Sequence, residues 1–285
     1  MKISTVTVFT VMHIVLSLTL TELVWSDAAN DAYDEGVRLL REGRHREAIA
    51  SFDKAIRLNP RSAEAYHGRG IAYDEMIQYE RAIKDYDAAL GLNAQYAEAY
   101  FDRGNAYSDL GQYERAVKDY DEALRLDQNY SGAYYNRSLA YMSLGRSEVA
   151  ADARAYVNLK GWRDERSQYM VIFGYIGDRR GQRDSEASKL LDEAAAQCDK
   201  TVWPYPVIQY LRREISAQDL LAAATDPDKK TEARAYLGLD LALSGHQEEA
   251  LRHLQWVKEN GQKALAEYAF ALVELRRTQS PAAKP

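Results

Sequence analysis

Residues Arg103 to Leu124 read RGNAYSDLGQYERAVKDYDEAL, and residues Arg69 to Leu90, 34 positions earlier, read RGIAYDEMIQYERAIKDYDAAL. Fifteen of the 22 aligned positions are identical. Glycine recurs with the same spacing at Gly36, Gly70 and Gly104. A fixed period of this length indicates stacked copies of one supersecondary element.

Each copy has the pattern of two helices. Tyr66, Gly70 and Tyr73 fall on one face of a helix with 3.6 residues per turn. Small residues at fixed positions let two helix axes approach closely, and a large aromatic residue opposite fills the gap. Gly111 lies between the two halves and can take a positive φ where the first helix ends. The sequence therefore predicts an all-α fold of antiparallel helix pairs.

These residues make the chain resemble the tetratricopeptide repeat (TPR) family. The resemblance covers four repeats within residues 27–165, at 29–62, 63–96, 97–130 and 131–164. The fourth repeat is degenerate, with departures at Ser138, Arg154 and Val157. The resemblance implies a right-handed superhelical solenoid whose concave groove binds peptides or partner helices.

A divergent TPR-like helical region is expected over residues 166–277. It contains helices near 168–180 and 185–198, one further repeat at 231–262 and a capping helix at 263–277. The cap has Leu265, Ala269, Leu272 and Leu275 on or near one face, and residues 278–285 are expected to be disordered. This part is weakly similar to bacterial envelope TPR lipoproteins that act as adaptors for cell-wall hydrolases, although the chain has no cysteine near its N-terminus to accept a lipid.

Residues 1–26 have the pattern of a secretory signal peptide. Lys2 precedes an apolar run from Val6 to Leu20, and small residues precede a plausible cut before Asp27. The chain is therefore expected to be exported to a periplasm or the cell exterior. The alternative is an uncleaved N-terminal membrane anchor, and no other segment is long and apolar enough to span a bilayer.

Composition and motifs argue against catalysis and nucleic-acid binding. The net charge of the 285 residues is −6, which disfavours a generic nucleic-acid binder. Motifs for zinc hydrolysis, nucleophilic serine, phosphate loops and dinucleotides are absent. No catalytic residue, metal ligand or cofactor is predicted. The single cysteine, Cys198, is expected to be a small buried residue near a helix end, the alternative being a disulfide between chains.

The resemblance also implies which residues line the groove. The inner positions of the family's first helices correspond here to Tyr33, Glu64, His67, Asp74, Glu98, Phe101, Asp102, Asn105, Asp109, Tyr135 and Asn136. Four of these form a column of rings, Tyr33, His67, Phe101 and Tyr135. The rings either seal the inner wall or form a ladder that docks apolar side chains of a peptide.

Charge suggests the chemistry of the partner. Residues 27–130 carry 14 Lys/Arg against 21 Asp/Glu, whereas residues 131–285 carry 22 against 21. An acidic groove selects basic segments, unless the acids only keep the groove soluble. The predicted function is an exported scaffold or adaptor that binds basic proteins or peptides, with a cell-wall glycan binder as the alternative. The oligomeric state stays open.

Three arginines recur just before the first-helix position that is usually glycine. They are Arg69, Arg103 and Arg137. We expect Arg103 to meet Asp85 or Asp87, and Arg137 to meet Asp119 or Asp121, as charge-assisted hydrogen bonds between neighbouring repeats. The alternative is a set of solvated charges that contribute roughly 0–1 kcal/mol each.

Overall fold

The computed structural model describes residues 27–279, and in that range every regular element is a helix. The described residues divide into two compact parts, 27–112 and 113–279. We call these parts the N-terminal and C-terminal lobes. The predicted all-α class is confirmed. The predicted signal peptide lies outside the described residues, as does most of the predicted disordered tail.

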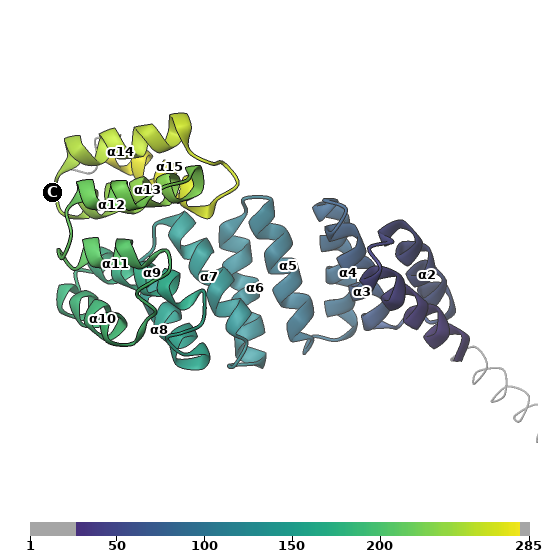
Figure 1. Ribbon diagram of the computed structural model, residues 1–285. Coiled ribbons are helices and arrows are strands. Elements are labelled where there is room, and N and C mark those ends of the chain that lie inside the picture. Colours follow the sequence, from purple (N-terminus) through teal and green to yellow (C-terminus); the bar gives the residue numbers. More distant parts are fainter. Residues whose placement is uncertain (1–26, 280–285) are drawn as a thin grey trace, which may run out of the picture. The chain divides into compact units, whose positions relative to one another are not determined.

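The N-terminal lobe is a row of helices that pack against their neighbours in the sequence (Figure 1). Residues 27–41 are helical and are followed by α2 His45–Leu58, α3 Ala63–Asp74, α4 Tyr79–Leu92 and α5 Ala97–Asp109. The first helices of successive repeats, α3 and α5, also contact each other. These first helices carry most of the residues predicted to bind a partner.

Close approach of the helices explains why glycine recurs in the repeats. A Cβ atom added at Gly70 would lie 2.6 Å from Cε1 of Tyr86, which is almost completely buried. A Cβ atom at Gly68 would lie 2.6 Å from Phe52 in the same way. A methyl group cannot fit at these distances, so the ring of one helix packs directly on the backbone of another.

The turn between α3 and α4 places an isoleucine where the neighbouring repeats have glycine. Ile77 has φ 60°, whereas Gly43 and Gly111 have φ 72° and 70°. The Ile77 side chain is 73% exposed and therefore contributes little packing. A β-branched residue in the left-handed region costs roughly 1–2 kcal/mol.

We expect Ile77→Gly to raise the free energy of unfolding by roughly 1 kcal/mol, because it removes this strain at a small cost in chain entropy. Urea denaturation of the full chain would measure the change. Met76→Gly, one position earlier, is the matched control and should not stabilise the protein. A midpoint for Ile77→Gly that is unchanged or lower would show that the turn is not strained.

The C-terminal lobe contains ten helices among its described residues (Figure 1). They are α6 Tyr113–Leu126, α7 Ser131–Leu144, α8 Val149–Lys160, α9 Ser167–Arg180, α10 Asp184–Gln197, α11 Tyr205–Leu211, α12 Ala217–Ala223, α13 Pro227–Leu243, α14 Gln247–Asn260 and α15 Ala266–Gln279. Helix α9 is buried without interruption from Met170 to Asp178 and contacts α7, α8, α10, α11 and α13. It forms the centre of this lobe.

The final helix buries only part of the face predicted for it, together with residues outside that face. Helix α15 contacts α13 and α14, as a cap would, but it also packs against α7. Its buried residues are Glu267, Phe270, Ala271, Glu274 and Leu275, whereas Ala269 and Leu272 are only half-buried. Leu275 is buried as predicted. Further residues are buried because a second surface of α15 is covered by α7 and by Phe173 and Arg180 of α9, in addition to the surface covered by the α13–α14 pair.

The recurring arginines form the predicted contacts between repeats. Arg103 Nη1 donates to Asp87 Oδ1 at 2.5 Å, and Arg137 Nη1 donates to Asp121 Oδ1 at 2.5 Å. Both acceptors lie on the second helix of the preceding repeat, and both side chains are about half exposed. Both arginines are therefore paired across the repeats as predicted, while solvent still reaches the two carboxylates.

Each of two arginines also has a second, buried partner that the sequence did not reveal. Arg69 donates two hydrogen bonds of 2.7 Å to Asp85, on the second helix of its own repeat. Arg137 donates to Asp152 in the same way, at 2.8 and 2.5 Å. Burial raises the pKa of Asp152, and the Arg137 guanidinium opposes that shift. These bidentate pairs hold the two helices of one repeat together.

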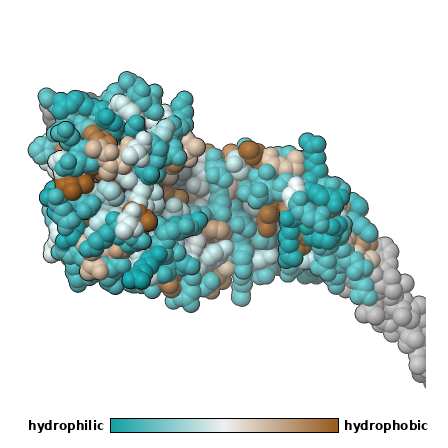
Figure 2. Space-filling model, viewed as in Figure 1, coloured by the Kyte–Doolittle hydropathy of each residue, from teal (hydrophilic) through white to brown (hydrophobic). Residues whose placement is uncertain are grey.

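The single cysteine lies in the C-terminal lobe. Cys198 is buried beside the end of α10, as predicted, and burial raises its pKa to about 11. Within residues 27–279, no helix has both the length and the apolar character that crossing a bilayer requires. Hydrophilic side chains cover most of the visible face, and apolar ones are scattered over it (Figure 2).

Candidate partner-binding site

The N-terminal lobe holds most of the residues predicted to line the groove. Nine of the eleven lie on its first helices: Tyr33 on 27–41, Glu64, His67 and Asp74 on α3, and Glu98, Phe101, Asp102, Asn105 and Asp109 on α5. Tyr135 and Asn136 lie on α7 of the C-terminal lobe. We call the face formed by the nine residues the inner face of the N-terminal lobe.

His67 on α3 is committed to contacts within the protein. The residue is only 8% exposed, and its Nε2 lies 2.8 Å from Asp102 Oδ2 on α5. The Tyr96 hydroxyl lies 2.9 Å from Nδ1, and the two rings are 4.7 Å apart. Because a carboxylate only accepts, Nε2–H donates to Asp102, and in the neutral ring Nδ1 then accepts from the Tyr96 hydroxyl. His67 therefore ties α3 to α5 and helps to seal the inner face.

Tyr33 also packs within the lobe, but it leaves a small hollow beside it. Its ring centroid lies 5.8 Å from that of Phe52. A cavity of about 150 Å³ brings Tyr33 together with Glu64 and Ser62 at the start of α3. Burial raises the pKa of Tyr33, and the Glu64 carboxylate raises it further. Two predicted residues from neighbouring repeats thus meet at this hollow.

Carboxyl groups from α3 and α5 converge on the same face. Oδ1 of Asp74 is buried and has no hydrogen-bond partner among the described residues. Burial, followed by the charges of Asp109, Asp102 and Glu75, raises the pKa of Asp74 to about 6. Burial also raises the pKa of Asp109. Every charged group that shifts the pKa of Asp74 is a carboxyl, so a cation would be stabilised beside it.

Tyr135 belongs to a different environment in the C-terminal lobe. Its ring centroid lies 5.9 Å from that of Tyr156 on α8, and the Arg166 guanidinium lies 4.8 Å from the ring centroid. Burial raises its pKa. Helix α7, which carries Tyr135, is the helix that α15 packs against. The ring of Tyr135 is thus partly covered by the chain itself.

A buried pair of glutamates in the C-terminal lobe was not expected from the sequence. Trp203 Nε1 donates to Glu232 Oε2 at 2.7 Å, and the Tyr236 hydroxyl donates to Glu267 Oε1 at 2.5 Å. Burial, and then the charge of Glu267, raises the pKa of Glu232 to about 7, and burial raises the pKa of Glu267. The hydrogen bond between Tyr236 and Glu267 joins α13 to α15, and it brings the Glu267 carboxyl close enough to affect Glu232.

This pair predicts that stability falls as the pH rises from about 4.5 to about 7. The folded-state pKa of Glu232 is raised, so the folded chain binds the extra proton in that window and its stabilising effect is lost above it. We expect Glu232→Gln to make this slope shallower, because only the contribution of Glu232 is lost, and to stabilise the protein at pH 8 by on the order of 2 kcal/mol. Urea denaturation between pH 4.5 and 8 would measure both. Exposed Glu259→Gln is the control, and equal slopes in all three proteins would contradict the assignment.

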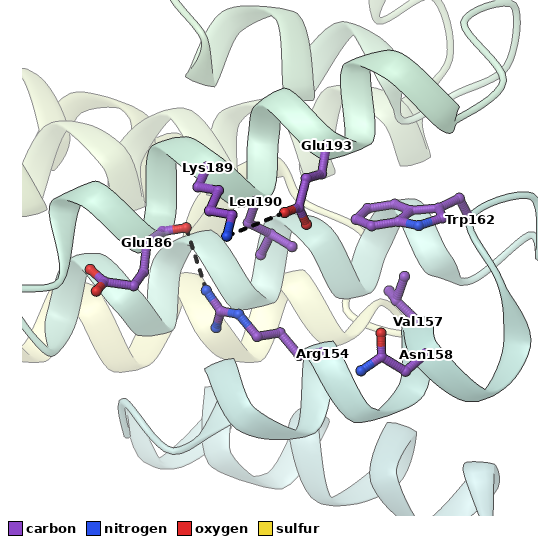
Figure 3. Close-up of a pocket in the computed structure, with 8 residues that line it drawn as sticks. All are labelled: Arg154, Val157, Asn158, Trp162, Glu186, Lys189, Leu190 and Glu193. Atoms are coloured by element: carbon purple, nitrogen blue, oxygen red, sulfur yellow. Dashed lines mark hydrogen bonds and ion pairs between the residues drawn. The ribbon is translucent and has the colours of Figure 1, made fainter.

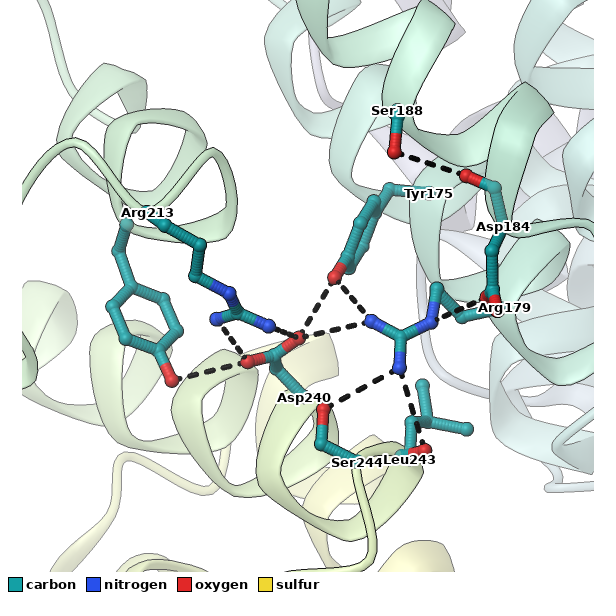
Figure 4. A network of polar contacts seen from close by, with 9 residues as sticks. Tyr175, Arg179, Asp184, Ser188, Arg213, Asp240, Leu243 and Ser244 are labelled. Atoms are coloured by element: carbon teal, nitrogen blue, oxygen red, sulfur yellow. Dashed lines mark hydrogen bonds and ion pairs between the residues drawn. The ribbon is translucent and has the colours of Figure 1, made fainter.

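A second buried carboxyl, Asp240 on α13, is fully paired (Figure 4). It accepts hydrogen bonds from the Tyr175 hydroxyl at 2.8 Å and the Tyr210 hydroxyl at 3.0 Å. Arg213 donates to both of its oxygens, at 2.7 and 3.0 Å. Because its hydrogen-bond partners all belong to the chain and Asp240 is 1% exposed, the network joins α9, α11 and α13 and leaves no ligand position on the Asp240 carboxylate itself.

Comparison with known proteins agrees with the arrangement of the helices. A family model described as TPR repeat matches residues 36–76, 78–111 and 104–145. The crystal structure of YrrB, described as a TPR protein with an unusual peptide-binding site, superposes with a TM-score of 0.53 at 18% identity, covering 65% of this chain and 91% of YrrB. MamA gives a TM-score of 0.52 at 20% identity, covering 60% of this chain and 91% of MamA.

A shorter stretch is similar to a TPR domain of another protein. The first TPR of Spaghetti (RPAP3), solved bound to an HSP90 peptide, is 28% identical over 42% of this chain and 94% of that domain, with a TM-score of 0.41. No match was found among curated protein sequences.

Within residues 27–279, no cluster of three or more His, Cys, Asp or Glu residues could hold a metal ion.

Proposed function

Because the chain is a tetratricopeptide repeat protein with paired helices that form a scaffold for binding proteins and peptides, we propose that the inner face of its N-terminal lobe binds a basic segment of a partner protein. The partner's segment lies across α3 and α5. Its Lys or Arg side chains pair with the carboxyl groups on these two helices. The scaffold itself performs no chemical step.

The main support for the proposal is that, within residues 27–279, Asp74 has a buried carboxyl oxygen without a hydrogen-bond partner and lies near other carboxyl groups. A buried carboxylate oxygen without a partner costs free energy, and neighbouring carboxyls increase that cost. A lysine or arginine of a partner would supply the missing hydrogen bond and the opposite charge. Asp109 and the second carboxylate oxygen of Asp102 give the partner further acceptors on α5, and the His67 ring, which already binds Asp102 Oδ2, holds that carboxylate in place.

The proposal is tested with a labelled decapeptide of alternating lysine and alanine, and with its glutamate counterpart. We expect the full chain to bind the basic peptide, less tightly as salt is added, and not to bind the acidic one. Asp74→Asn with Asp109→Asn should weaken binding about tenfold. Because the pKa of Asp74 is about 6, affinity should increase as the pH rises from 5 to 7 and this carboxyl ionises.

The matched control changes two exposed acids outside the inner face. Asp31→Asn with Glu80→Gln removes the same charge from the same lobe. If the control weakens binding as much as the inner-face variant does, only net charge matters and the proposed site is wrong. Equal binding of the acidic peptide would also overturn the proposal.

The packing of Tyr33 and His67 does not favour a glycan-binding role for these two rings. A sugar stacks on an open ring face, whereas Tyr33 packs on Phe52, and His67 lies between Tyr86 and Tyr96. We therefore propose no second function at this face.

We also propose that the scaffold is exported and works in a periplasm or outside the cell. The support is the sequence pattern of residues 1–26, with its charged start, apolar run and small residues before Asp27. Mass spectrometry of the protein from its native host would give a mature N-terminus at Asp27. A chain that retains residues 1–26 and fractionates with membranes would instead support the anchored alternative.

A further inference from the structure

A pocket in the C-terminal lobe lies between α8 and α10, the second helices of two successive pairs (Figure 3). Its volume is about 270 Å³. Val157 and Leu190 form an apolar floor, and both side chains are otherwise buried in the lobe. Trp162, in the loop after α8, stands at one end of the pocket, and Arg154 stands toward the other. Nothing in the proposed binding of a basic segment uses this pocket.

Trp162 lines the pocket with a half-exposed side chain and has no polar or ring partner within residues 27–279. Among those residues, its indole N–H has no hydrogen-bond partner and its ring has no aromatic or cationic neighbour. The other described tryptophans do have such contacts: Trp203 donates to Glu232, and Trp256 lies under the Arg234 guanidinium. A tryptophan ring that is left half-exposed keeps much of its apolar area in water, which favours a ligand that covers it.

Arg154 is held rigidly and its charge is compensated. Its guanidinium donates to the Ala150 carbonyl at 3.1 Å and the Glu186 carbonyl at 3.4 Å, and it forms an ion pair with buried Asp178. A fixed, planar guanidinium offers a face on which an aromatic ring stacks. The pocket therefore has two planar surfaces that suit an aromatic ligand, one from Arg154 and one from Trp162.

The rim of the pocket does not select a charged ligand. Lys189 lies 3.9 Å from Glu193, and the remaining rim charges, Arg154 and Glu186, are also of opposite sign. A cavity of about 150 Å³ holds one benzene molecule, so a larger one accommodates a ring together with the start of its backbone. We propose that this pocket binds one uncharged aromatic side chain, phenylalanine or tyrosine, of a partner protein.

The test uses the full chain and N-acetyl-phenylalanine amide as the probe. We expect the indole N–H resonance of Trp162 and the methyl resonances of Leu190 to shift together and saturate, with a Kd on the order of 1 mM, as for other ligands of this size. The leucine, lysine and glutamate derivatives should bind at least about tenfold more weakly. The resonance of Trp256 is the internal control and should not move.

Two variants make the result specific to the pocket. Trp162→Ala removes one planar wall, and Asn158→Trp fills the pocket from an exposed rim position; each should abolish saturation at the Leu190 methyls. Arg163→Ala, exposed and outside the pocket, should leave it unchanged. The proposal is overturned if no saturable shift occurs, if Trp256 shifts equally, if the leucine or charged derivatives bind as well as the aromatic one, or if both pocket variants still bind.

Discussion

Replacement of Arg137 by methionine is expected to lower the free energy of unfolding by about 3–5 kcal/mol, because it leaves a buried carboxylate without its partner. Asp152 has a side chain that is only 3% exposed, and it accepts two hydrogen bonds from Arg137. Burial already raises the pKa of Asp152 while the guanidinium is present. Without the guanidinium, the chain must either bury an unpaired charge or take up a proton in order to fold.

A double-mutant cycle distinguishes the two partners of Arg137. The coupling energy between Arg137→Met and Asp152→Asn should be about 2 kcal/mol or more. The coupling to Asp121→Asn should be below about 1 kcal/mol, because the Asp121 side chain is 50% exposed and solvent screens the pair. Urea denaturation of the single and double variants provides the measurement. A larger coupling to Asp121 would show that the contact between repeats, and not the contact within one, stabilises the fold.

The same arginine shows what the repeat pattern can and cannot predict. The 34-residue period predicted a contact between Arg137 and the preceding repeat, because Asp87 and Asp121 follow the period together with Arg103 and Arg137. It did not predict Asp152. In the regular second repeat the buried partner of Arg69 lies 16 residues later, at Asp85, whereas in the degenerate fourth repeat the separation from Arg137 is 15. Because of this one-residue difference, the 34-residue period does not align Asp152 with Asp85, although both aspartates bind the arginine of their own repeat.

The candidate site was predictable to a similar extent. Periodicity and family resemblance placed all eleven predicted residues on the first helices of four repeats, and the acidic character of the first three repeats was visible in the composition. The division of these residues into nine on the N-terminal lobe and two on α7 was not predicted. The sequence could not show that His67 is occupied by Tyr96 and Asp102, because those contacts depend on side-chain direction. It also could not show which carboxyl is buried. Within residues 27–279, Asp74 has a buried carboxyl oxygen without a hydrogen-bond partner, whereas Asp109 does not, and this difference arises from how the helices pack.

The contacts of α15 were the least predictable from the sequence. Arg277 Nη1 donates to the Gly145 carbonyl at 2.8 Å, across 132 residues of chain. Arg180 Nη2 donates to Glu274 at 2.6 Å, and both side chains are almost fully buried. Contacts between residues this far apart leave no local pattern in the sequence. The amphipathic pattern of α15 therefore predicted one buried face, whereas the structure buries two.

The second large effect is expected at this helix. Phe270→Ala should lower the free energy of unfolding by about 3–5 kcal/mol, the range for removing a fully buried phenylalanine. Phe270 is 1% exposed and packs edge-on against Phe173 of the central helix α9, with ring centroids 5.7 Å apart and an angle of 89°. The resulting cavity would lie between α9 and α15, next to the buried Arg180–Glu274 pair, so water entering it would weaken that ion pair as well.

The matched control is Leu272→Ala, on the face that the sequence predicted to be buried. Leu272 is half-buried, and its truncation should cost about 1 kcal/mol. Urea denaturation gives both values, and hydrogen exchange at the amides of α15 shows whether the helix detaches before the rest of the lobe unfolds. In the Phe270 variant we expect α15 amides to exchange faster while those of α9 stay protected. If Leu272→Ala costs as much as Phe270→Ala, the helix is rotated toward the face predicted from sequence, and the contact with α9 does not anchor it.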